Sequence, residues 1–411
     1  MDDPRVLRRL DITQEAHPAY VVWELTLKCD QRCTHCGSRA ADARSNELTT
    51  AEALGVVTQL AAMRTRELAL IGGEAYLHEG FLEIIAAIKA AGIRPSMTTG
   101  GRNITPALAR SMADAGLYSV SVSFDGIGPT HDAIRASVGG FVAATGALDA
   151  LKAAGIHTGS NTNVNRFNVA ELEALYDHLR AHGIEGWQVQ LTVPLGRAAD
   201  RPEMLLQPWE LLDLMPRLAR LKERALADRI AFVPGNSIGY FGPEETLLRS
   251  VHKGGRDHWH GCMAGRFVLG IESDGSVKGC PSLQTSHYVG GHVRERSIQD
   301  IWDNTNELSF TRRRTVDDLW GYCRTCEFAE ECMGGCSFTA HSLFGRPGNN
   351  PYCHFRARAL AKQGLRERLV PRDRAPGLPF DNGLFDLVVE PLDAPDPRVE
   401  PRERLLKVWR G

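Results

Sequence analysis

Three of the ten cysteines stand close together: Cys29, Cys33 and Cys36 form a C-x3-C-x2-C spacing directly after an apolar run. Three thiolates on one tight loop can hold three irons of a four-iron cubane and leave the fourth iron without a protein ligand, where chemistry can take place. A structural zinc takes four protein ligands, so this loop is a complete zinc site only if His35 or a distant residue joins it. We therefore expect an iron–sulfur cluster with one open iron, and a zinc or purely structural site is the alternative.

The other seven cysteines lie later in the chain, in the order Cys262, Cys280, Cys323, Cys326, Cys332, Cys336 and Cys353. The segment from Ile271 to Cys280 suits a β-hairpin that turns at Asp274-Gly275 and places Cys280 on the return strand. A zinc ribbon built from the four cysteines between 323 and 336 is the structural alternative, but it leaves the other three unused.

Alternating apolar runs and amphipathic stretches predict repeated βα units on a parallel sheet. We expect six strands, at Tyr20–Leu27, Glu67–Ile71, Arg94–Thr99, Ser119–Phe124, His157–Thr162 and Trp187–Thr192. Helices are expected near Gly80–Ala91, Pro106–Ala115, Phe141–Ala154, Val169–His182 and Pro208–Ala227. An earlier helix begins after Thr49, with Glu52 as its capping-box partner. This order predicts an α/β fold with a partial (β/α)6 TIM-type barrel, which binds ligands in the loops at the carboxyl ends of its strands.

The pattern changes after about Pro234 to short, glycine-rich segments without a long helix, which predicts a small cysteine-rich domain. The expected parts are an N-terminal extension at 1–19, the barrel at 20–233, a linking region at 234–260, the cysteine-rich domain at 261–366 and a C-terminal arm at 367–411. The arm is rich in Pro, Asp and Arg, and we expect it to lie as an extended segment or strand over the body.

The charge of the chain favours no polymeric partner. Its 48 Lys and Arg side chains nearly balance 50 Asp and Glu, so we expect no binding to nucleic acid. The N-terminal stretch lacks the apolar core of a signal peptide, and no segment approaches the roughly 18 apolar residues of a membrane span. We therefore expect a cytoplasmic protein with no membrane partner, whose cysteines serve metal binding, catalysis or packing rather than disulfides.

The spacing of Cys29, Cys33 and Cys36 after the first strand resembles the hallmark of the radical S-adenosylmethionine (SAM) superfamily, over about Val21 to Arg197. The resemblance implies that these thiolates bind a [4Fe–4S] cluster whose open iron is chelated by SAM. It further implies that an electron from an external flavodoxin- or ferredoxin-type donor cleaves SAM to a 5′-deoxyadenosyl radical, which abstracts hydrogen from a substrate. His35 stands where the family usually has an aromatic residue, and it keeps a flat ring.

Further residues resemble the SAM-binding motifs of the family, in the order of the strands. Gly72-Gly73-Glu74 looks like the GGE motif, in which backbone and carboxylate engage the ammonium of the methionine moiety. Thr99 lies in a segment that has Gly100 where Asn is common. The resemblance assigns the remaining contacts to Ser123 and Asp125 near the ribose, to Arg135 shortly beyond, and to the strand ends at Asn163 and Leu195. Each of these residues has an ordinary alternative as part of a turn or a helix cap.

The later cysteines resemble the SPASM domain, a module with two auxiliary clusters that occurs on radical enzymes that modify peptides and proteins. The resemblance assigns one auxiliary [4Fe–4S] cluster to Cys262, Cys280 and Cys336 and the other to Cys323, Cys326, Cys332 and Cys353, which makes three clusters in the chain. The first auxiliary cluster is one ligand short, because Arg256 stands where some relatives have a further cysteine. Its fourth iron is either open or bound by one of three nearby loop residues, Asp257, His258 and His260.

The resemblance leaves several reactions open. Sulfatase-maturing relatives have Asp after the cysteine equivalent to Cys280, and Pro281 argues against that activity here. We expect a ribosomally synthesised peptide as substrate, modified by crosslinking, epimerisation or oxidative decarboxylation. The stretch before Tyr20 is too short for a leader-binding domain, so recognition is expected to use a separate leader-binding protein, the barrel mouth or the C-terminal arm. The alternatives are radical chemistry on a sugar or tetrapyrrole precursor, and a non-catalytic zinc- or iron-binding scaffold.

The sequence assigns no catalytic acid or base. Tyr240 lies on a glycine-rich segment between the two domains, where it can line a pocket or serve as packing. Tyr322 and His341 flank the auxiliary ligands, and residues in such places are more often structural than catalytic.

Overall fold

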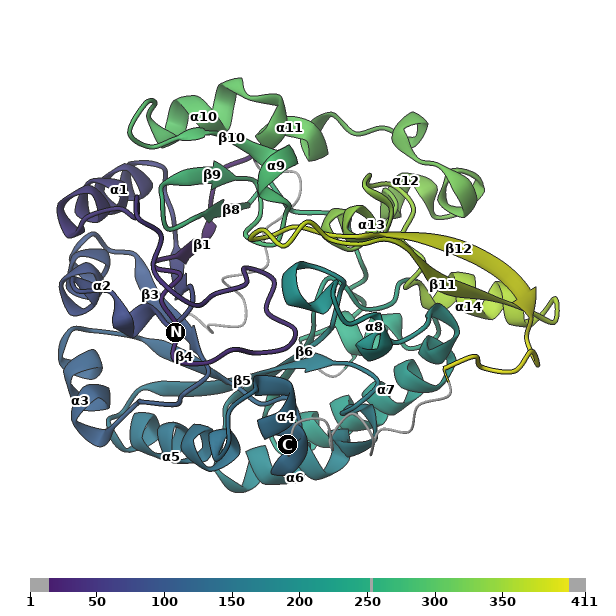
Figure 1. Ribbon diagram of the computed structural model, residues 1–411, viewed down its shortest axis with the longest axis horizontal. Helices are drawn as coiled ribbons and strands as arrows, with labels where there is room; N and C mark the ends of the chain where they lie inside the picture. The colour runs from purple at the N-terminus through teal and green to yellow at the C-terminus, as the bar shows by residue number, and fades with distance from the viewer. Residues whose placement is uncertain (1–14, 252–253, 399–411) are drawn as a thin grey trace.

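The computed structural model describes residues 15–251 and 254–398 (Figure 1). One ten-stranded sheet dominates it, in the order β10-β9-β8-β1-β2-β3-β4-β5-β6-β7. Strands β8 and β1 to β7 are parallel, and β9 and β10 add to one edge in antiparallel fashion. The strands are β1 Tyr20–Glu24, β2 Glu67–Ile71, β3 Arg94–Thr99, β4 Ser119–Ser123, β5 His157–Val164, β6 Gly186–Leu191, β7 Ala231–Pro234, β8 Val268–Ile271, β9 Ser276–Lys278 and β10 Val289–His292.

Helices surround the parallel strands on the outside of the curved sheet, as Figure 1 shows. They are α1 Thr50–Ala62, α2 Phe81–Ala90, α3 Pro106–Asp114, α4 Pro129–Arg135, α5 Gly140–Ala153, α6 Leu172–Ala181 and α7 Leu211–Ala227. The predicted capping box is confirmed, because the Thr49 side chain accepts the Glu52 N–H and the Glu52 carboxylate accepts the Thr49 N–H. Within the described ranges, no single helix is long and apolar enough to cross a membrane; α4 and α5 meet that requirement only together, as a pair bent by 95°.

The predicted α/β class and the parallel barrel sheet are confirmed, with differences at particular elements. Strand β7 and helix α4 are additional to the prediction, and both are too short, at four and seven residues, to give a periodic pattern. Strand β1 ends at Glu24 instead of Leu27, since the following residues leave the sheet and Lys28 pairs with Ala41 at the base of the cysteine loop.

The cysteine-rich region continues the sheet of the barrel instead of standing apart from it. Strand β8 pairs in parallel with β1, and β9 returns beside β8, which confirms the predicted hairpin at Asp274-Gly275. The expected place of Cys280 on the return strand is wrong, because β9 ends at Lys278 and Cys280 follows it. Buried Ile301, Trp302 and Tyr352 belong to the same apolar core as the barrel. The short helices of this half are α8 Glu245–Arg249, α9 Thr285–Tyr288, α10 Ile298–Asn304, α11 Asn306–Arg313, α12 Ala329–Cys332, α13 Ser337–Phe344 and α14 His354–Ala361.

The C-terminal arm forms an antiparallel hairpin of β11 Leu365–Asp373 and β12 Leu384–Pro391, and its tip reaches back to the middle of the molecule (Figure 1). At the tip, the Phe380 N–H donates to the Gly37 carbonyl at 3.0 Å, and the Asp381 carbonyl accepts the Gly196 N–H at 2.7 Å. Arg39 also binds the Asp381 carboxylate at 2.9 Å. The end of the chain therefore contacts the loop that carries the first three cysteines.

Buried charges join the barrel to the β8–β9 hairpin. The guanidinium nitrogens of Arg44 lie 2.8 Å from a carboxylate oxygen of Glu272, 2.9 Å from one of Asp274 and 3.4 Å from one of Glu24. Lys278 is fully buried, and its Nζ lies 2.7 Å from Glu272. Burial raises the pKa of Glu24 to about 7, and the negative charge of Glu272 adds to this effect while Arg44 and Lys278 oppose it.

We expect Glu24→Gln to flatten the dependence of stability on pH. The pKa of Glu24 is about 7 in the folded protein against an ordinary value of 4.5, so the folded state holds this proton more tightly. Its stabilising contribution is complete below the ordinary value and is lost as the pH rises through about 7. Thermal unfolding from about pH 6 to about pH 8 should therefore show a smaller loss of stability in the variant than in the wild type. The exposed Glu83→Gln serves as control, and an equally steep loss in the Glu24 variant would contradict the expectation.

Candidate functional site

The first cysteine loop lies at the carboxyl end of β1, where the sequence predicts ligand binding. Its base is closed by the Cys29 N–H, which donates to the Ala41 carbonyl at 2.9 Å. Backbone N–H groups also approach two of the sulfurs: Gln31 N lies 3.4 Å from Cys29 Sγ, and Ala40 N lies 3.4 Å from Cys36 Sγ. Amide donors around sulfur suit thiolates that hold an iron–sulfur cluster.

The thiols of this loop are buried enough to disfavour free thiolates. Burial raises the pKa of Cys29 to about 12 and that of Cys33 to about 11. Binding to a metal replaces the thiol proton, so these side chains become thiolates when they act as ligands. No three His, Cys, Asp or Glu side chains of residues 15–251 and 254–398 meet closely enough to bind a single ion. A cubane does not require this, because each of its cysteines binds a different iron.

Two glycines hold the end of β2 against the base of the loop. A Cβ on Gly72, whose φ is +149°, would lie 2.2 Å from the Thr26 carbonyl oxygen, and a Cβ on Gly73 would lie 2.2 Å from that of Lys28. The Gly73 N–H donates to Thr26 at 2.7 Å, and the Glu74 N–H donates to Lys28 at 2.8 Å. The glycine pair thus allows close approach of backbone to backbone, where the sequence suggests close approach to a ligand.

Glu74 directly follows the two glycines and is buried, with only 2% of its surface exposed. Its carboxylate accepts hydrogen bonds from Thr99 Oγ1 at 2.6 Å and from the Gly100 N–H at 2.7 Å. Burial raises the pKa of Glu74 to about 7 despite these donors. A buried carboxylate gains stability from a nearby cation, so its position suits the predicted ammonium ligand. Thr99 acts here by orienting Glu74.

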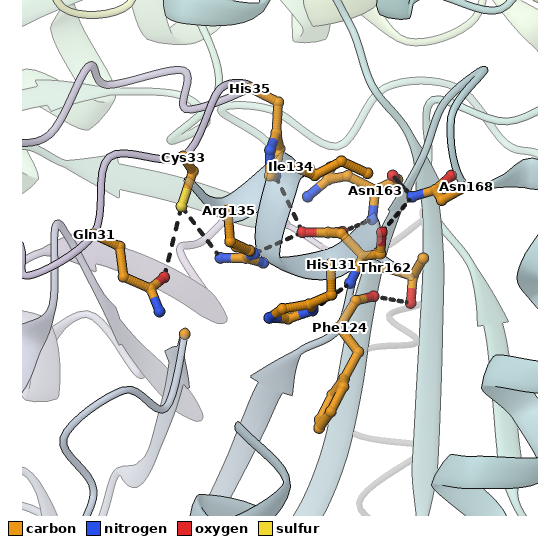
Figure 2. A network of polar contacts seen from close by, with 12 residues as sticks. Gln31, Cys33, His35, Phe124, His131, Ile134, Arg135, Thr162, Asn163 and Asn168 are labelled. Atoms are coloured by element: carbon orange, nitrogen blue, oxygen red, sulfur yellow. Dashed lines mark hydrogen bonds and ion pairs between the residues drawn. The ribbon is translucent and has the colours of Figure 1, made fainter. Parts of the chain in front are cut away.

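Figure 2 shows the polar network on the other side of Cys33. Asp125 is 0% exposed, and its carboxylate lies 2.7 Å from Arg135 Nε, 3.3 Å from His35 Nε2 and 2.8 Å from the Asn163 N–H. Burial acts to raise the pKa of Asp125, but Arg135 and His35 hold it below its usual range. Arg135 Nη1 in turn lies 3.7 Å from Cys33 Sγ. The carboxylate that the resemblance assigns to the ribose is therefore used to orient Arg135 and His35.

The other predicted contacts lie at the same edge of the sheet. Ser123 is the buried last residue of β4, and Asn163 Oδ1 accepts a hydrogen bond from Gln190 at 2.9 Å. Leu195 lies under the cysteine loop, because a Cβ on Gly37 would lie 2.9 Å from Leu195 Cδ2. The structure therefore brings the predicted residues to the mouth of the barrel, with Leu195 as packing.

One of the two later cysteine groups surrounds a cavity. The cavity is lined by the aromatic residues Phe241, Tyr322, Phe328 and Phe355, by Arg356, and by all four cysteines assigned to the second auxiliary cluster, Cys323, Cys326, Cys332 and Cys353. Four thiols that line one cavity fit a cubane whose irons all have protein ligands.

The other later group consists of Cys262, Cys280 and Cys336. Cys262 and Cys280 pack beside Leu283 and Tyr288. Both lie close enough to Cys336 for a charge on one thiol to affect the pKa of another. This is the grouping that the SPASM resemblance implies.

The histidines considered as a fourth ligand contact each other, with ring centroids 4.1 Å apart for His258 and His260. His258 also lies 6.0 Å from the ring of Phe241, which lines the four-cysteine cavity. The backbone N–H of Asp257 donates to Ser250 Oγ at 3.1 Å. These contacts place His258 beside the second auxiliary group.

Tyr240 lies between the two later groups. It is buried, its hydroxyl accepts the Cys336 N–H at 3.0 Å, and its carbonyl faces Cys353 Sγ at 3.7 Å. Its packing role is therefore the one that the structure shows. His341 is bonded through Nδ1 to the Tyr288 hydroxyl at 2.9 Å, which places it beside the group of Cys262.

Comparison with known proteins gives matches in the same two parts of the chain. The family model of the radical SAM superfamily matches residues 23–179, and that of the SPASM iron–sulfur cluster-binding domain matches residues 262–327. The chain belongs to the radical SAM superfamily. It is a SPASM member of this superfamily, so iron–sulfur clusters and SAM are its cofactors.

This radical SAM protein has relatives with different named activities. It is 28% identical over 349 residues to the AdoMet-dependent heme synthase of Methanosarcina barkeri, and the alignment covers 82% of this chain and 97% of the relative. It is 29% identical over 384 residues to the mycofactocin maturase MftC of Mycobacterium tuberculosis, which covers 90% of this chain and 91% of the relative. Among solved structures, Streptococcus suis SuiB bound to S-adenosylmethionine has the same fold, with a TM-score of 0.62, 15% identity and coverage of 82% and 76%.

We expect Gly73→Ala to disrupt the base of the first cysteine loop. The added methyl would lie 2.2 Å from the Lys28 carbonyl, so the backbone must shift, at a cost of about 1–3 kcal/mol or more. Iron and sulfide content and the free energy of unfolding should both fall. Gly55→Ala is the matched control, because a Cβ there has no atom within 4 Å and helix α1 should gain up to about 1 kcal/mol. Full iron content in the Gly73 variant would contradict the role given to this contact.

Proposed function

We propose that this radical SAM enzyme modifies a ribosomally synthesised peptide after translation, by crosslinking, epimerisation or oxidative decarboxylation. The observation that carries the radical chemistry is the three-thiol loop at the barrel mouth, placed between buried Glu74 on one side and the Asp125–Arg135 network on the other. The loop supplies three metal ligands. Glu74 supplies a carboxylate that can accept an ammonium, and Arg135 supplies a guanidinium that can bind an anion.

We assign three [4Fe–4S] clusters to the three thiol groups. In this proposal the loop cysteines hold the SAM-binding cluster, and the SPASM cysteines hold two auxiliary clusters, the first with three cysteine ligands and the second with four. When bound, the first cluster and SAM supply a 5′-deoxyadenosyl radical that takes hydrogen from the substrate. Glu74 would hold the ammonium of the methionine moiety, and Thr99 and the Gly100 N–H orient its carboxylate. The electron comes from an external donor of the flavodoxin or ferredoxin type.

The second auxiliary group supports electron transfer more than substrate binding. Its four cysteines would leave no iron open, and aromatic side chains line the cavity around them. The first auxiliary group has three cysteines, so an iron there is free to bind substrate or a further side chain. We therefore place the substrate between the first cysteine loop and the group of Cys262, Cys280 and Cys336, within a barrel domain at 20–233 and a cysteine-rich domain at 261–366.

The relatives support two substrate classes. The maturase, which aligns with 90% of this chain, supports a peptide substrate and a separate leader-binding partner. The heme synthase and the Fe-coproporphyrin III synthase of Methanosarcina barkeri keep a tetrapyrrole as the second candidate.

We expect the variant with Cys29, Cys33 and Cys36 all replaced by Ala to lose SAM cleavage and to keep iron at the other two groups. The three thiols are the ligands of the SAM-binding cluster, whereas the later groups lie elsewhere in the fold. Anaerobically reconstituted wild type with dithionite and SAM should release 5′-deoxyadenosine, and the variant should release none. The iron and sulfide content should fall to about two thirds, as expected for loss of one cubane in three. Zinc without sulfide in the wild type would overturn the enzyme hypothesis.

A substrate assay separates the two classes. We expect a short precursor peptide encoded beside the gene to increase 5′-deoxyadenosine formation and to change in mass, because substrate hydrogen is consumed with each productive cleavage. The same assay with an iron coproporphyrin is the matched comparison. Turnover with the porphyrin and none with the peptide would replace the first proposal with the second.

A further inference from the structure

Gln31, between the first two cysteines of the loop, has a side-chain amide that the roles given above leave unused. The residue is only 2% exposed. Its Oε1 faces Cys33 Sγ at 3.6 Å, as Figure 2 shows, in the arrangement of a thiol that donates to an amide oxygen. Its Nε2 is buried and has no hydrogen-bond partner among the described residues. A buried amide with an unpaired donor is costly, so it calls for a partner.

The position of this amide is fixed by a residue from another strand end. A Cβ on Gly100 would lie 2.3 Å from Gln31 Oε1 and 2.9 Å from Nε2, so the amide fills the space above Gly100. On the other side of Cys33, Arg135 Nη1 lies 3.7 Å from the sulfur. Cys33 is therefore held between two side chains, and only one of them, Arg135, presents a donor to it.

The hydrogen-bonding pattern changes when Cys33 binds iron. An iron-bound thiolate has no proton, so it can no longer donate to Gln31 Oε1 and two acceptors would face each other. The two ends of an amide have nearly the same shape, and a half-turn exchanges oxygen and nitrogen in the same space. After this turn Nε2 donates to the sulfur, and the buried N–H has its partner.

We propose that Gln31 Nε2 donates an N–H···S hydrogen bond to the Cys33 thiolate and, together with Arg135, raises the reduction potential of the SAM-binding cluster. This inference rests on the proposed assignment of that cluster to Cys29, Cys33 and Cys36. A hydrogen bond to a ligand sulfur stabilises the reduced cluster, which carries more negative charge, relative to the oxidised one. Cys29 and Cys36 receive backbone N–H donors that no side-chain substitution removes. Ser38 Oγ also lies 3.6 Å from Cys36 Sγ, so Gln31 and Arg135 are the side chains that adjust the potential at Cys33.

The test is a potentiometric titration of the full-length, anaerobically reconstituted protein, followed by electron paramagnetic resonance. Gln31→Met keeps the size and burial of the side chain and removes both N–H donors. We expect the midpoint of the SAM-responsive cluster signal to shift to a more negative potential in this variant, with the auxiliary signals unchanged. Gln207→Met is the matched control, because Gln207 is a buried glutamine bonded to Leu369, far along the chain from the cysteine loop, and its loss should leave the midpoint in place.

The outcomes separate this inference from the proposed function. A fully assembled cluster with an unchanged midpoint in Gln31→Met would overturn the hydrogen bond and leave the enzyme proposal intact. Absence of a SAM-responsive cluster in the wild type would overturn the proposed function itself.

A second measurement does not depend on the variant folding. In wild-type protein labelled with ¹⁵N at glutamine side-chain amides, we expect a ¹⁵N coupling on the reduced SAM-binding cluster. A spectrum without this coupling would overturn the proposal.

Discussion

The site depends on one close backbone contact, between the end of β2 and the segment that leads from β1 into the cysteine loop. No side chain fits between Gly72-Gly73 and the carbonyl groups of Thr26 and Lys28. The N–H groups of Gly73 and Glu74 donate to the carbonyls of Thr26 and Lys28 and hold the two segments together. The position of Glu74 is therefore set before any ligand binds. Glu74 then accepts hydrogen bonds from Thr99 and Gly100, and this extends the same tie from β2 to β3.

The opposite side of the loop is held by charge instead of backbone contact. The carboxylate of buried Asp125 contacts both Arg135 Nε and His35 Nε2, whereas His35 Nδ1 has no hydrogen-bond partner among the described residues. Buried ion pairs add little net stability, because desolvation cancels most of the attraction between the charges. What they provide is a fixed geometry at the end of β4, in a place where a mobile guanidinium would not reliably meet Cys33. Preorganised groups of this kind are what a reactive centre needs from its surroundings.

The sequence predicts the strands of the barrel well because their apolar runs are long and are separated by regular helical stretches. It does not predict α4 or β7, which are too short to carry a period. The grouping of the later cysteines comes from the SPASM resemblance, because their spacing alone also allows a zinc ribbon built from the four cysteines between 323 and 336. The roles of Gln31 and Asp125 could not be predicted, because each depends on side chains or backbone from another strand end. Asp125 is buried and contacts His35, Arg135 and the Asn163 N–H, and the local sequence around it does not predict these contacts.

The C-terminal hairpin has a consequence for how the protein is put together. Its tip is bonded to the first cysteine loop, and Arg39 on that loop contacts Leu378 across a separation of 339 residues. Contacts between such distant parts of a chain form late in folding, because closing the long loop between them costs chain entropy before the contact stabilises the fold. Until then the cysteine loop lacks its contacts with Phe380 and Asp381 at the tip of the hairpin. We therefore expect the loop to be most accessible to iron delivery during synthesis and early folding, and the last strands to seal the metal in place.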